Sequence, residues 1–401
     1  MPSILGLSAY YHDSAAAVVR DGDTIAAAQE ERFTRIKHDY HFPTNAAHYC
    51  VKEAGIEIEN LDYVAFYDKP LQKFDRLIET YLAYVPAGLQ SFMMAMPLWL
   101  KTKLHLPREI RKALDGRFKK RIVFTGHHES HAASAYYPSP FDKAAILTID
   151  GVGEWDTATI GIGEGNKMRL LKTMHFPHSL GLLYSAVTYF CGFKVNSGEY
   201  KLMGLAPYGE PKYADIILDK LIELKEDGSL AMDMSYFSYC AGLRMTNDKF
   251  AALFGGPARN PETPITQREM DLAASIQFVT EKSVLAMARY ARQLTGCENL
   301  CMAGGVALNC VANGKLLRAG IFKEIFVQPA AGDAGGALGA ALFVHYNLLN
   351  NERKADPGDS CKGSLLGPKF SNEEVLADLD KVGAVYEFIE DEAKLLEVVA
   401  R

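Results

Sequence analysis

The chain has 401 residues, of which 48% are hydrophobic and 23% are charged, a composition typical of a soluble globular protein with two or three domains. Its formal net charge of −6 argues against a nucleic-acid-binding protein, because such domains usually present a basic surface. The seven cysteines form no closely spaced framework, so we expect a reducing, cytoplasmic environment.

The first part of the chain is predicted to contain strands joined by polar turns, followed by helices. The expected elements, in order, are strands at 4–9, 15–19 and 24–29, a helix in FPTNAAHYCVKEAG, and strands at 62–68 and 121–126. A long, mostly helical insertion is expected at about 69–118, between the last two of these strands. A further helix should begin within the segment TGHHESHAASAYY.

The same pattern begins again at residue 144. Strands are expected at 144–150 and in TATIGIG and MRLLKTMHF, with the glycine-rich turn DGVGEWD after the first of them. Two copies of strand, turn, strand, turn and strand therefore occur about 140 residues apart, and an internal repeat of this kind predicts two similar lobes.

The second copy continues with helices and further strands. Helices are expected at about 179–191 and 268–294, and the segments NLCMAGGVALN and EIFVQPAAGDAGGALG each read as strand, glycine turn and helix. Residues 350–368 are rich in glycine, proline and charge and read as a linker. Beyond it we expect a helix in SNEEVLADLDKVG, a strand in AVYEFI and a last helix, as the start of a truncated further domain.

No membrane span or secretion signal is predicted. The N-terminal MPSILGLSAYYHDS lacks the basic region and the long apolar run of a signal peptide. The most apolar stretch, at 87–100, contains Gln90 and Pro97 and is too short to cross a bilayer. We interpret it as an amphipathic insertion or a lid.

Three loops have the composition of phosphate-binding turns: SAYYHDSAA, DGVGEWD and AGGVALN. Gly151 and Gly153 in the second loop allow close approach of a ligand to the backbone. Neither a P-loop motif nor GxGxxG after the first strand occurs. A duplicated unit with facing nucleotide loops resembles the actin-like ATPase (ribonuclease H-like) α/β fold, with two lobes around a central cleft.

His127 and His131 are predicted metal ligands, because residues four apart share one face of a helix. Asp150 and Asp333 are the further candidates, since each follows a predicted strand and precedes glycine-rich sequence. Two imidazoles and two carboxylates suit a first-row divalent ion, Fe²⁺ first, with Zn²⁺ or Mn²⁺ as alternatives. Asp333 can instead cap a helix, and Asp150 can instead bind a magnesium–phosphate group. His128 lies off this face and is expected at the surface or behind the ligands.

Six motifs in order, HDSAAAVV, QEERFTRIKHD, HHESHAASA, SGEYKLMGLAPYG, AGGVALN and GDAGGALGAAL, resemble the nodulation-type O-carbamoyltransferase family. The resemblance covers about residues 2–350. Its actin-like part is similar in turn to the tRNA threonylcarbamoyladenosine transferase. The implied domains are a first lobe at 1–142, a second lobe at 143–348, and a linker with the start of a carbamoyl-phosphate domain at 349–401.

The resemblance implies a reaction in two steps. Carbamoyl phosphate and ATP give carbamoyl adenylate in a separate C-terminal domain, which this chain is expected to lack. An acceptor hydroxyl then attacks the carbamoyl carbon in the actin-like part, and AMP leaves. A metal on the four predicted ligands would polarise the carbamoyl oxygen or orient the adenylate phosphate.

Further site residues follow from the same motifs. His12, beside Asp13, is the candidate base for the acceptor hydroxyl, with packing or phosphate binding as the alternative. Glu199 and Lys201 are assigned to the nucleotide or to loop anchoring, with an ordinary surface pair as the alternative. The nucleotide's ribose or base is assigned to Gly304, Gly305 and Asn309.

The expected partner is a small-molecule or carbohydrate hydroxyl acceptor, without nucleic acid, and a homodimer is compatible with the sequence. Two other functions stay open: a tRNA-modifying relative or actin-like small-molecule kinase, and a non-catalytic nucleotide-binding module. A kinase would need magnesium rather than a histidine-bound metal, so metal analysis separates it from the transferase.

Overall fold

The computed structural model describes residues 2–401. The chain divides into two compact units, with the boundary between Leu366 and Gly367. The first unit holds both predicted lobes. The second is short and mostly helical.

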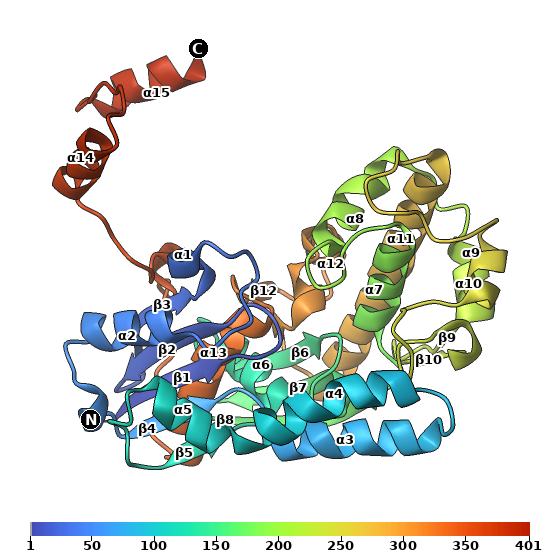
Figure 1. The fold of residues 1–401 in the computed structure, drawn as a ribbon, viewed down its shortest axis with the longest axis horizontal. Coiled ribbons are helices and arrows are strands. Elements are labelled where there is room, and N and C mark those ends of the chain that lie inside the picture. The colour runs from blue at the N-terminus through green and yellow to red at the C-terminus, as the bar shows by residue number, and fades with distance from the viewer. Residues whose placement is uncertain (1) are drawn as a thin grey trace. The chain divides into compact units, whose positions relative to one another are not determined.

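The first lobe is built on a sheet of five strands in the order β3-β2-β1-β4-β5 (Figure 1). The strands are β1 (Ser3–Ser8), β2 (Ala15–Arg20), β3 (Asp23–Gln29), β4 (Tyr63–Phe66) and β5 (Ile122–Phe124). β1, β2 and β3 form an antiparallel meander, and β4 and β5 add in parallel beside β1. Every residue of β1 is buried, as expected for a central strand that is covered on both faces.

The second lobe repeats this arrangement with a sheet in the order β12-β11-β6-β7-β8. Its strands are β6 (Lys143–Ile149), β7 (Asp156–Glu164), β8 (Lys167–His175), β11 (Asn299–Ala303) and β12 (Glu324–Val327). Here too the first three strands form an antiparallel meander, and the last two add in parallel beside the first. The shared strand order confirms the predicted duplicated actin-like α/β fold.

Two helices cross from one lobe to the other. α6 (His127–Tyr136) follows β5 of the first sheet but packs on β6, β7 and β11 of the second. α13 (Asp333–Leu342) follows β12 but packs on β1, β2 and β4 of the first sheet, and α6 and α13 also pack against each other. A Cβ atom at Gly6 would overlap the carbonyl oxygen of Ala337, and one at Gly339 would overlap that of Ser130. Only glycine permits these close approaches of α13.

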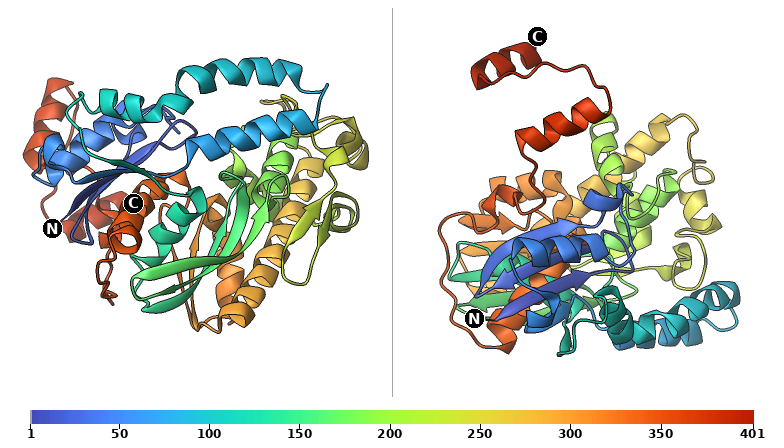
Figure 2. Two further views of the ribbon diagram at one scale, coloured as in Figure 1. Left: turned by 90° about the horizontal axis from the view of Figure 1, so that it is seen from below. Right: turned by 60° about the vertical axis from the view of Figure 1, so that its left-hand side comes forward.

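The predicted helical insertion is present between β4 and β5 as α3 (Pro70–Ala83), α4 (Leu89–Lys101) and α5 (Leu106–Ala113). α3 and α4 lie side by side (Figures 1 and 2). The aromatic pairs Phe74–Trp99 and Tyr81–Phe92 join them.

The outer face of α4 is apolar. Leu89, Met93, Met94 and Leu98 are each more than half exposed, whereas Ser91 is buried and donates a hydrogen bond to the carbonyl oxygen of Ala241. α4 therefore carries apolar side chains on both faces, because Phe92 and Trp99 pack against α3. Within residues 2–401, no helix combines the length and the apolar character that a bilayer span requires.

Most of the remaining helices of the second lobe gather around α11, which packs on β6 and β7 of the sheet (Figure 1). They are α7 (Leu180–Phe190), α8 (Glu199–Leu205), α9 (Ala214–Ile216), α10 (Asp248–Leu253), α11 (Gln267–Thr295) and α12 (Cys310–Arg318), with a small hairpin of β9 (Ile222–Leu224) and β10 (Leu230–Met232). α11 buries Leu272, Ile276 and Val279, as its periodicity predicts.

Residues 349–366 run along the first lobe as part of the first unit. Arg353 is buried and donates hydrogen bonds to the carbonyl oxygens of Tyr137, Phe141 and Ser139. The carbonyl oxygen of Leu366 accepts a hydrogen bond from the backbone of Ala27 in β3.

The first lobe also contains the short helix α1 (Glu31–Thr34) and the helix α2 (Thr44–Glu53). The second unit contains the predicted helices α14 (Asn372–Lys381) and α15 (Glu392–Ala400). The strand predicted at 384–389 is wrong: these residues form no strand, and Val385 is exposed. A strand needs a neighbour to pair with, and residues 367–401 contain no second strand to offer one.

Candidate active site and metal centre

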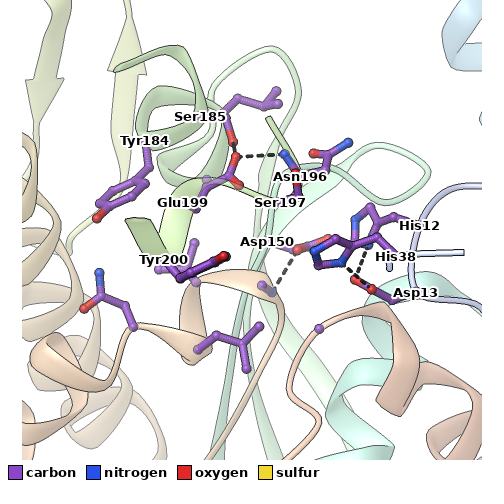
Figure 3. A pocket seen from close by; sticks show the side chains of 18 of the residues that line it. His12, Asp13, His38, Asp150, Tyr184, Ser185, Asn196, Ser197, Glu199 and Tyr200 are labelled. Carbon is purple, nitrogen blue, oxygen red and sulfur yellow. Dashed lines mark hydrogen bonds and ion pairs between the residues drawn. The ribbon is translucent and has the colours of Figure 1, made fainter. Parts of the chain in front are cut away.

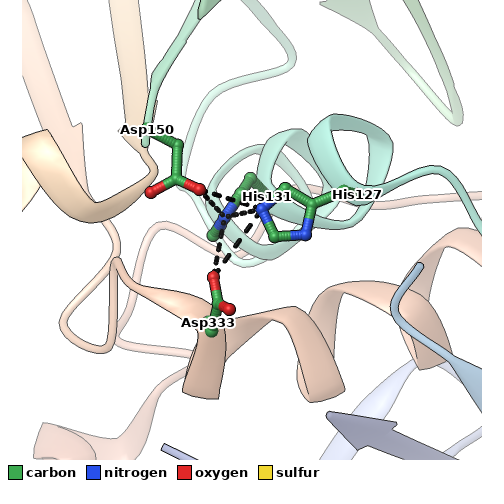
Figure 4. Close-up of side chains that lie close together, drawn as sticks. All are labelled: His127, His131, Asp150 and Asp333. Carbon is green, nitrogen blue, oxygen red and sulfur yellow. Dashed lines mark hydrogen bonds and ion pairs between the residues drawn. The ribbon is translucent and has the colours of Figure 1, made fainter. Parts of the chain in front are cut away.

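The crossing helices bring the four predicted ligands together (Figure 4). His127 and His131 occupy the first two turns of α6, and Asp333 is the first residue of α13. Asp150 directly follows the last residue of β6. Because α6 packs on β6 and also on α13, the N-terminal ends of both helices meet the carboxyl end of this strand.

The ligand atoms of these four side chains all lie within 4.8 Å of one another. Nε2 of His127 is 3.2 Å from Nε2 of His131 and 2.9 Å from Oδ2 of Asp150. Oδ1 of Asp333 is 3.7 Å from Nε2 of His127 and 3.6 Å from Nε2 of His131. His127, His131 and Asp333 are at most 1% exposed.

These distances fit a divalent cation. Four ligands at about 2.1 Å from a tetrahedral ion lie about 3.4 Å from each other, and the measured separations of 2.9–3.8 Å bracket that value. Both imidazoles turn Nε2 inward, and within residues 2–401 their buried Nδ1 atoms have no hydrogen-bond partner. Nitrogen and carboxylate ligands suit iron, zinc and manganese better than calcium.

The electrostatics of the cluster favour a bound positive charge. Burial raises the pKa of Asp150, but hydrogen bonds from His127 and His131 outweigh this effect and hold the pKa well below its usual range. For Asp333, the charges of His12 and His127 likewise outweigh burial and lower the pKa. Burial alone would lower the pKa of His131, yet the two carboxylates raise it to about 9. Both carboxylates are therefore ionised at neutral pH.

Two groups that the sequence did not single out, Glu154 and Tyr67, hold the predicted ligands in place. The carboxylate of Glu154 accepts a hydrogen bond from the backbone of His127 at 3.0 Å. The hydroxyl of Tyr67 donates to Oδ2 of Asp333 at 3.2 Å. Glu154 lies in the glycine-rich turn DGVGEWD. Its place in a candidate ligand-binding turn is the sequence signal that could have identified it.

Two alternative roles can be compared with the structure. Asp333 does not occupy the N-cap of α13, because Gly332 does. His128 is buried rather than at the surface: Nδ1 lies 2.6 Å from the hydroxyl of Thr148, and Nε2 lies 2.9 Å from the carbonyl oxygen of Asp156. Its two ring nitrogens are thus engaged behind the ligands.

A cavity opens beside the cluster, between the turn at 11–13 of the first lobe and the helices of the second (Figure 3). Asp150 belongs to both the cluster and the cavity wall. The other predicted site residues that line the cavity are His12, Asp13, Gly151, Glu199, Gly305 and Asn309. A ligand in this cavity can therefore contact Asp150, one of the four residues of the cluster.

The remaining predicted site residues lie elsewhere. Gly153 packs against His127, and Gly304, with φ of +92°, lies against the backbone of Ile149. Lys201 is exposed on α8 and, within the described chain, is not among the cavity-lining residues. A nucleotide role for these three positions stays a prediction.

Glu199 and Asn309 line the cavity but are already engaged. Glu199 accepts hydrogen bonds from the hydroxyl of Ser185 and the backbone of Asn196, which matches its predicted loop-anchoring role. The amide of Asn309 exchanges two hydrogen bonds with Gln277 and caps α12 by accepting from the backbone of Ala312. Oδ1 of Asn309 is thus engaged within the protein, and the second N–H of its amide is the group left for a ligand.

His12 lies between the cluster and Asp13. Its Nδ1 is 2.8 Å from Oδ2 of Asp13, and its Nε2 is 3.8 Å from Oδ2 of Asp333. Burial lowers the pKa of His12, but Asp333 and Asp13 outweigh it and raise the pKa to about 9. A cation among the four ligands would offset the charge of Asp333 and oppose this rise.

Residues 3–342 match the family model described as "Carbamoyltransferase N-terminus". An uncharacterised protein of Synechocystis sp. is 60% identical over 400 residues, which cover 98% of this chain and 65% of that protein. Nodulation protein NolNO of Sinorhizobium fredii is 38% identical over 348 residues, which cover 84% of this chain and 47% of that protein. The chain thus spans less than two thirds of the length of either relative.

Among solved structures, T. kodakarensis HypF matches with a TM-score of 0.44 and 14% identity, over 87% of this chain and 48% of that chain. We assign the fold from the shared strand order of the two five-stranded sheets, independently of this likeness. The match across residues 3–342, together with the nodulation-protein relatives, means that this chain belongs to the carbamoyltransferase family of enzymes.

Proposed function

We propose that this chain transfers a carbamoyl group from carbamoyl adenylate to a hydroxyl group of a small-molecule or carbohydrate acceptor. Membership of the carbamoyltransferase family supports the transferred group. The observation that carries the proposal is the convergence of His127, His131, Asp150 and Asp333 beside a cavity whose wall includes Asp150.

In this proposal the four side chains hold a divalent cation, Fe²⁺ first and Zn²⁺ or Mn²⁺ as alternatives. When bound there, the cation supplies stabilisation for negative charge on the carbamoyl oxygen or on the adenylate phosphate. Tyr67 and Glu154 keep the ligands oriented through Asp333 and the backbone of His127.

The reaction forms one bond and breaks one. The acceptor oxygen bonds to the carbamoyl carbon, and the bond from this carbon to the phosphate oxygen breaks, which releases AMP. The hydroxyl proton passes to Nε2 of neutral His12, a state that a cation in the cluster would favour by opposing the rise in the pKa of His12. Asp13 accepts a hydrogen bond from Nδ1 and fixes the ring. Gly151 and Gly305, which line the cavity, are assigned to the nucleotide.

Carbamoyl adenylate must come from ATP and carbamoyl phosphate. We assign its formation to residues outside this chain, because the relatives are longer: the chain spans 65% of the Synechocystis protein and 47% of NolNO. On its own, the chain is then expected to use supplied carbamoyl adenylate without making it.

The test uses the full-length protein with ATP, carbamoyl phosphate and a panel of hydroxylated acceptors, with products identified by mass. The expected result is an acceptor that gains one carbamoyl group together with an equal amount of AMP. A phosphorylated acceptor with release of ADP would contradict the proposal and point to a kinase. Carbamoylation that persists at full rate in His127→Ala would contradict the role of the cluster.

A further inference from the structure

We propose that His38 is a positioning residue that holds Asp13, and through Asp13 the base His12, in the orientation needed for proton transfer. This inference rests on the proposed role of His12. His38 lies in a loop after α1, 26 residues from His12, and lines the same cavity (Figure 3).

Asp13 stands between two imidazoles. Its Oδ2 is 2.8 Å from Nδ1 of His12, and its Oδ1 is 2.7 Å from Nδ1 of His38. Burial raises the pKa of Asp13, but the hydrogen bonds to these two histidines outweigh it and lower the pKa, so the carboxylate is ionised. An ionised carboxylate only accepts hydrogen bonds, so both Nδ1 atoms carry protons and both Nε2 atoms are left to face other groups.

Engagement of both oxygens restricts the carboxylate. With one imidazole alone, the carboxylate of Asp13 could rotate about its Cβ–Cγ bond, a torsion with a broad energy profile. The second hydrogen bond, from His38, holds the plane of the carboxylate and hence the direction of the bond to His12. Removal of His38 should therefore leave His12 present but less well aligned.

The loop that carries His38 is itself fixed to the turn that carries His12. The backbone of His38 donates to Oε2 of Glu31 at 2.8 Å. The backbone of Ser14 donates to the carbonyl oxygen of Asp39, and that of Tyr10 to the carbonyl oxygen of Tyr40. The two segments therefore form one hydrogen-bonded assembly around Asp13.

The geometry distinguishes the two histidines. Nε2 of His12 lies 3.8 Å from Oδ2 of Asp333 and so faces the metal centre. Nε2 of His38 is buried and has no hydrogen-bond partner within residues 2–401. His12 is thus the nearer of the two to the reacting atoms, and His38 acts through the carboxylate.

The test compares two substitutions in the full-length enzyme, with an acceptor that the wild type carbamoylates. The side-chain amide of His38→Asn can still donate to Asp13, whereas His38→Phe cannot. For His38→Phe we expect kcat to fall at least about tenfold, with KM for the acceptor little changed. His38→Asn should recover most of the lost kcat.

A double-mutant cycle separates positioning from a general structural role. If His38 acts through Asp13, His38→Phe should cost little more in kcat when Asp13→Asn is already present. The control is His41→Phe, because exposed His41 makes the analogous hydrogen bond to Asp39 in the same loop but does not line the cavity; its kcat should match the wild type. Equal losses in His38→Asn and His38→Phe, or additive losses with Asp13→Asn, would overturn the inference.

A measurement without turnover keeps the inference separate from the proposed function. In ¹⁵N-histidine-labelled protein, the Nδ1 protons of His12 and His38 should both appear downfield, as charge-assisted hydrogen bonds require. His38→Phe should remove one signal and shift the other, while His41→Phe leaves both in place. An unchanged His12 signal in His38→Phe would overturn the inference. If the wild-type protein instead shows both signals but transfers no carbamoyl group, only the function assigned to His12 is overturned.

Discussion

Gly153 lies directly against the imidazole of His127. A Cβ atom at position 153 would be 2.9 Å from both Cβ and Cδ2 of His127, closer than such atoms normally approach. Gly153→Ala should therefore displace a metal ligand without altering any ligand atom, and lower metal affinity about tenfold or more. Titration of the metal-free protein with Zn²⁺, followed by calorimetry, measures the change.

The matched control for this substitution is Gly151→Ala in the same turn. A Cβ atom there meets nothing nearer than Cδ2 of Leu182 at 3.9 Å, an ordinary contact. Zn²⁺ affinity should stay at the wild-type value. If the two alanine variants bind Zn²⁺ equally well, packing of Gly153 against His127 does not set the ligand's position.

Removal of either imidazole should empty the metal centre. His127→Ala or His131→Ala leaves two carboxylates with one imidazole, and the loss of one nitrogen ligand should weaken binding enough for dialysis to remove a first-row cation. Elemental analysis of the purified variants should find iron, zinc and manganese reduced to background. His128→Asn is the control, because His128 binds Thr148 and a backbone carbonyl rather than the cluster, and it should retain metal. Full metal content in both alanine variants would rule out this centre.

The histidine beside the cluster should make the stability of the metal-free protein depend on pH. The pKa of His12 is raised from 6.5 to about 9 in the folded state. Its contribution to folding is therefore complete below about pH 6.5 and is lost as the pH rises through about 9. The contribution is on the order of 3 kcal/mol, because each pKa unit corresponds to about 1.4 kcal/mol.

Thermal unfolding in EDTA measures this effect as the difference in Tm between wild type and His12→Asn. The difference should be largest near pH 6 and shrink steadily towards pH 9.5. With saturating Zn²⁺ the dependence on pH should flatten, because the cation offsets the charge of Asp333 that raises the pKa. A difference that grows with pH would contradict the sign of the shift.

The convergence of the four candidate ligands could be predicted from the sequence because each stands at a position that local structure defines. The four-residue spacing of His127 and His131 places both on one face of a helix. Asp150 and Asp333 stand at the end of a strand and the start of a helix, and the duplicated strand pattern indicates that such ends meet at the cleft. Local periodicity and the repeat together were sufficient.

The supporting residues could not be found this way. Tyr67, Glu154 and His38 reach the site from a strand end, a turn and a loop, and their positions depend on how those segments pack. Long-range packing has no sequence period of its own. The same limit explains the wrong strand prediction at 384–389, where a mostly apolar run has no neighbouring strand with which to pair.

The buried guanidinium of Arg353 should be essential for stability but not for metal binding. Within residues 2–401 its hydrogen bonds all go to carbonyl and hydroxyl oxygens near the C-terminal end of α6, including those of Tyr137, Phe141 and Ser139. Arg353→Met leaves these carbonyl groups buried without a donor and should destabilise the fold by about 2–4 kcal/mol.

The control is Arg289→Met, at an exposed position of α11, which should change stability by less than about 0.5 kcal/mol. Urea unfolding measures both, and Zn²⁺ affinity of folded Arg353→Met should equal that of wild type, because the ligands lie at the other end of α6. An Arg353→Met protein as stable as Arg289→Met would show that water satisfies these carbonyl groups as well as the guanidinium does.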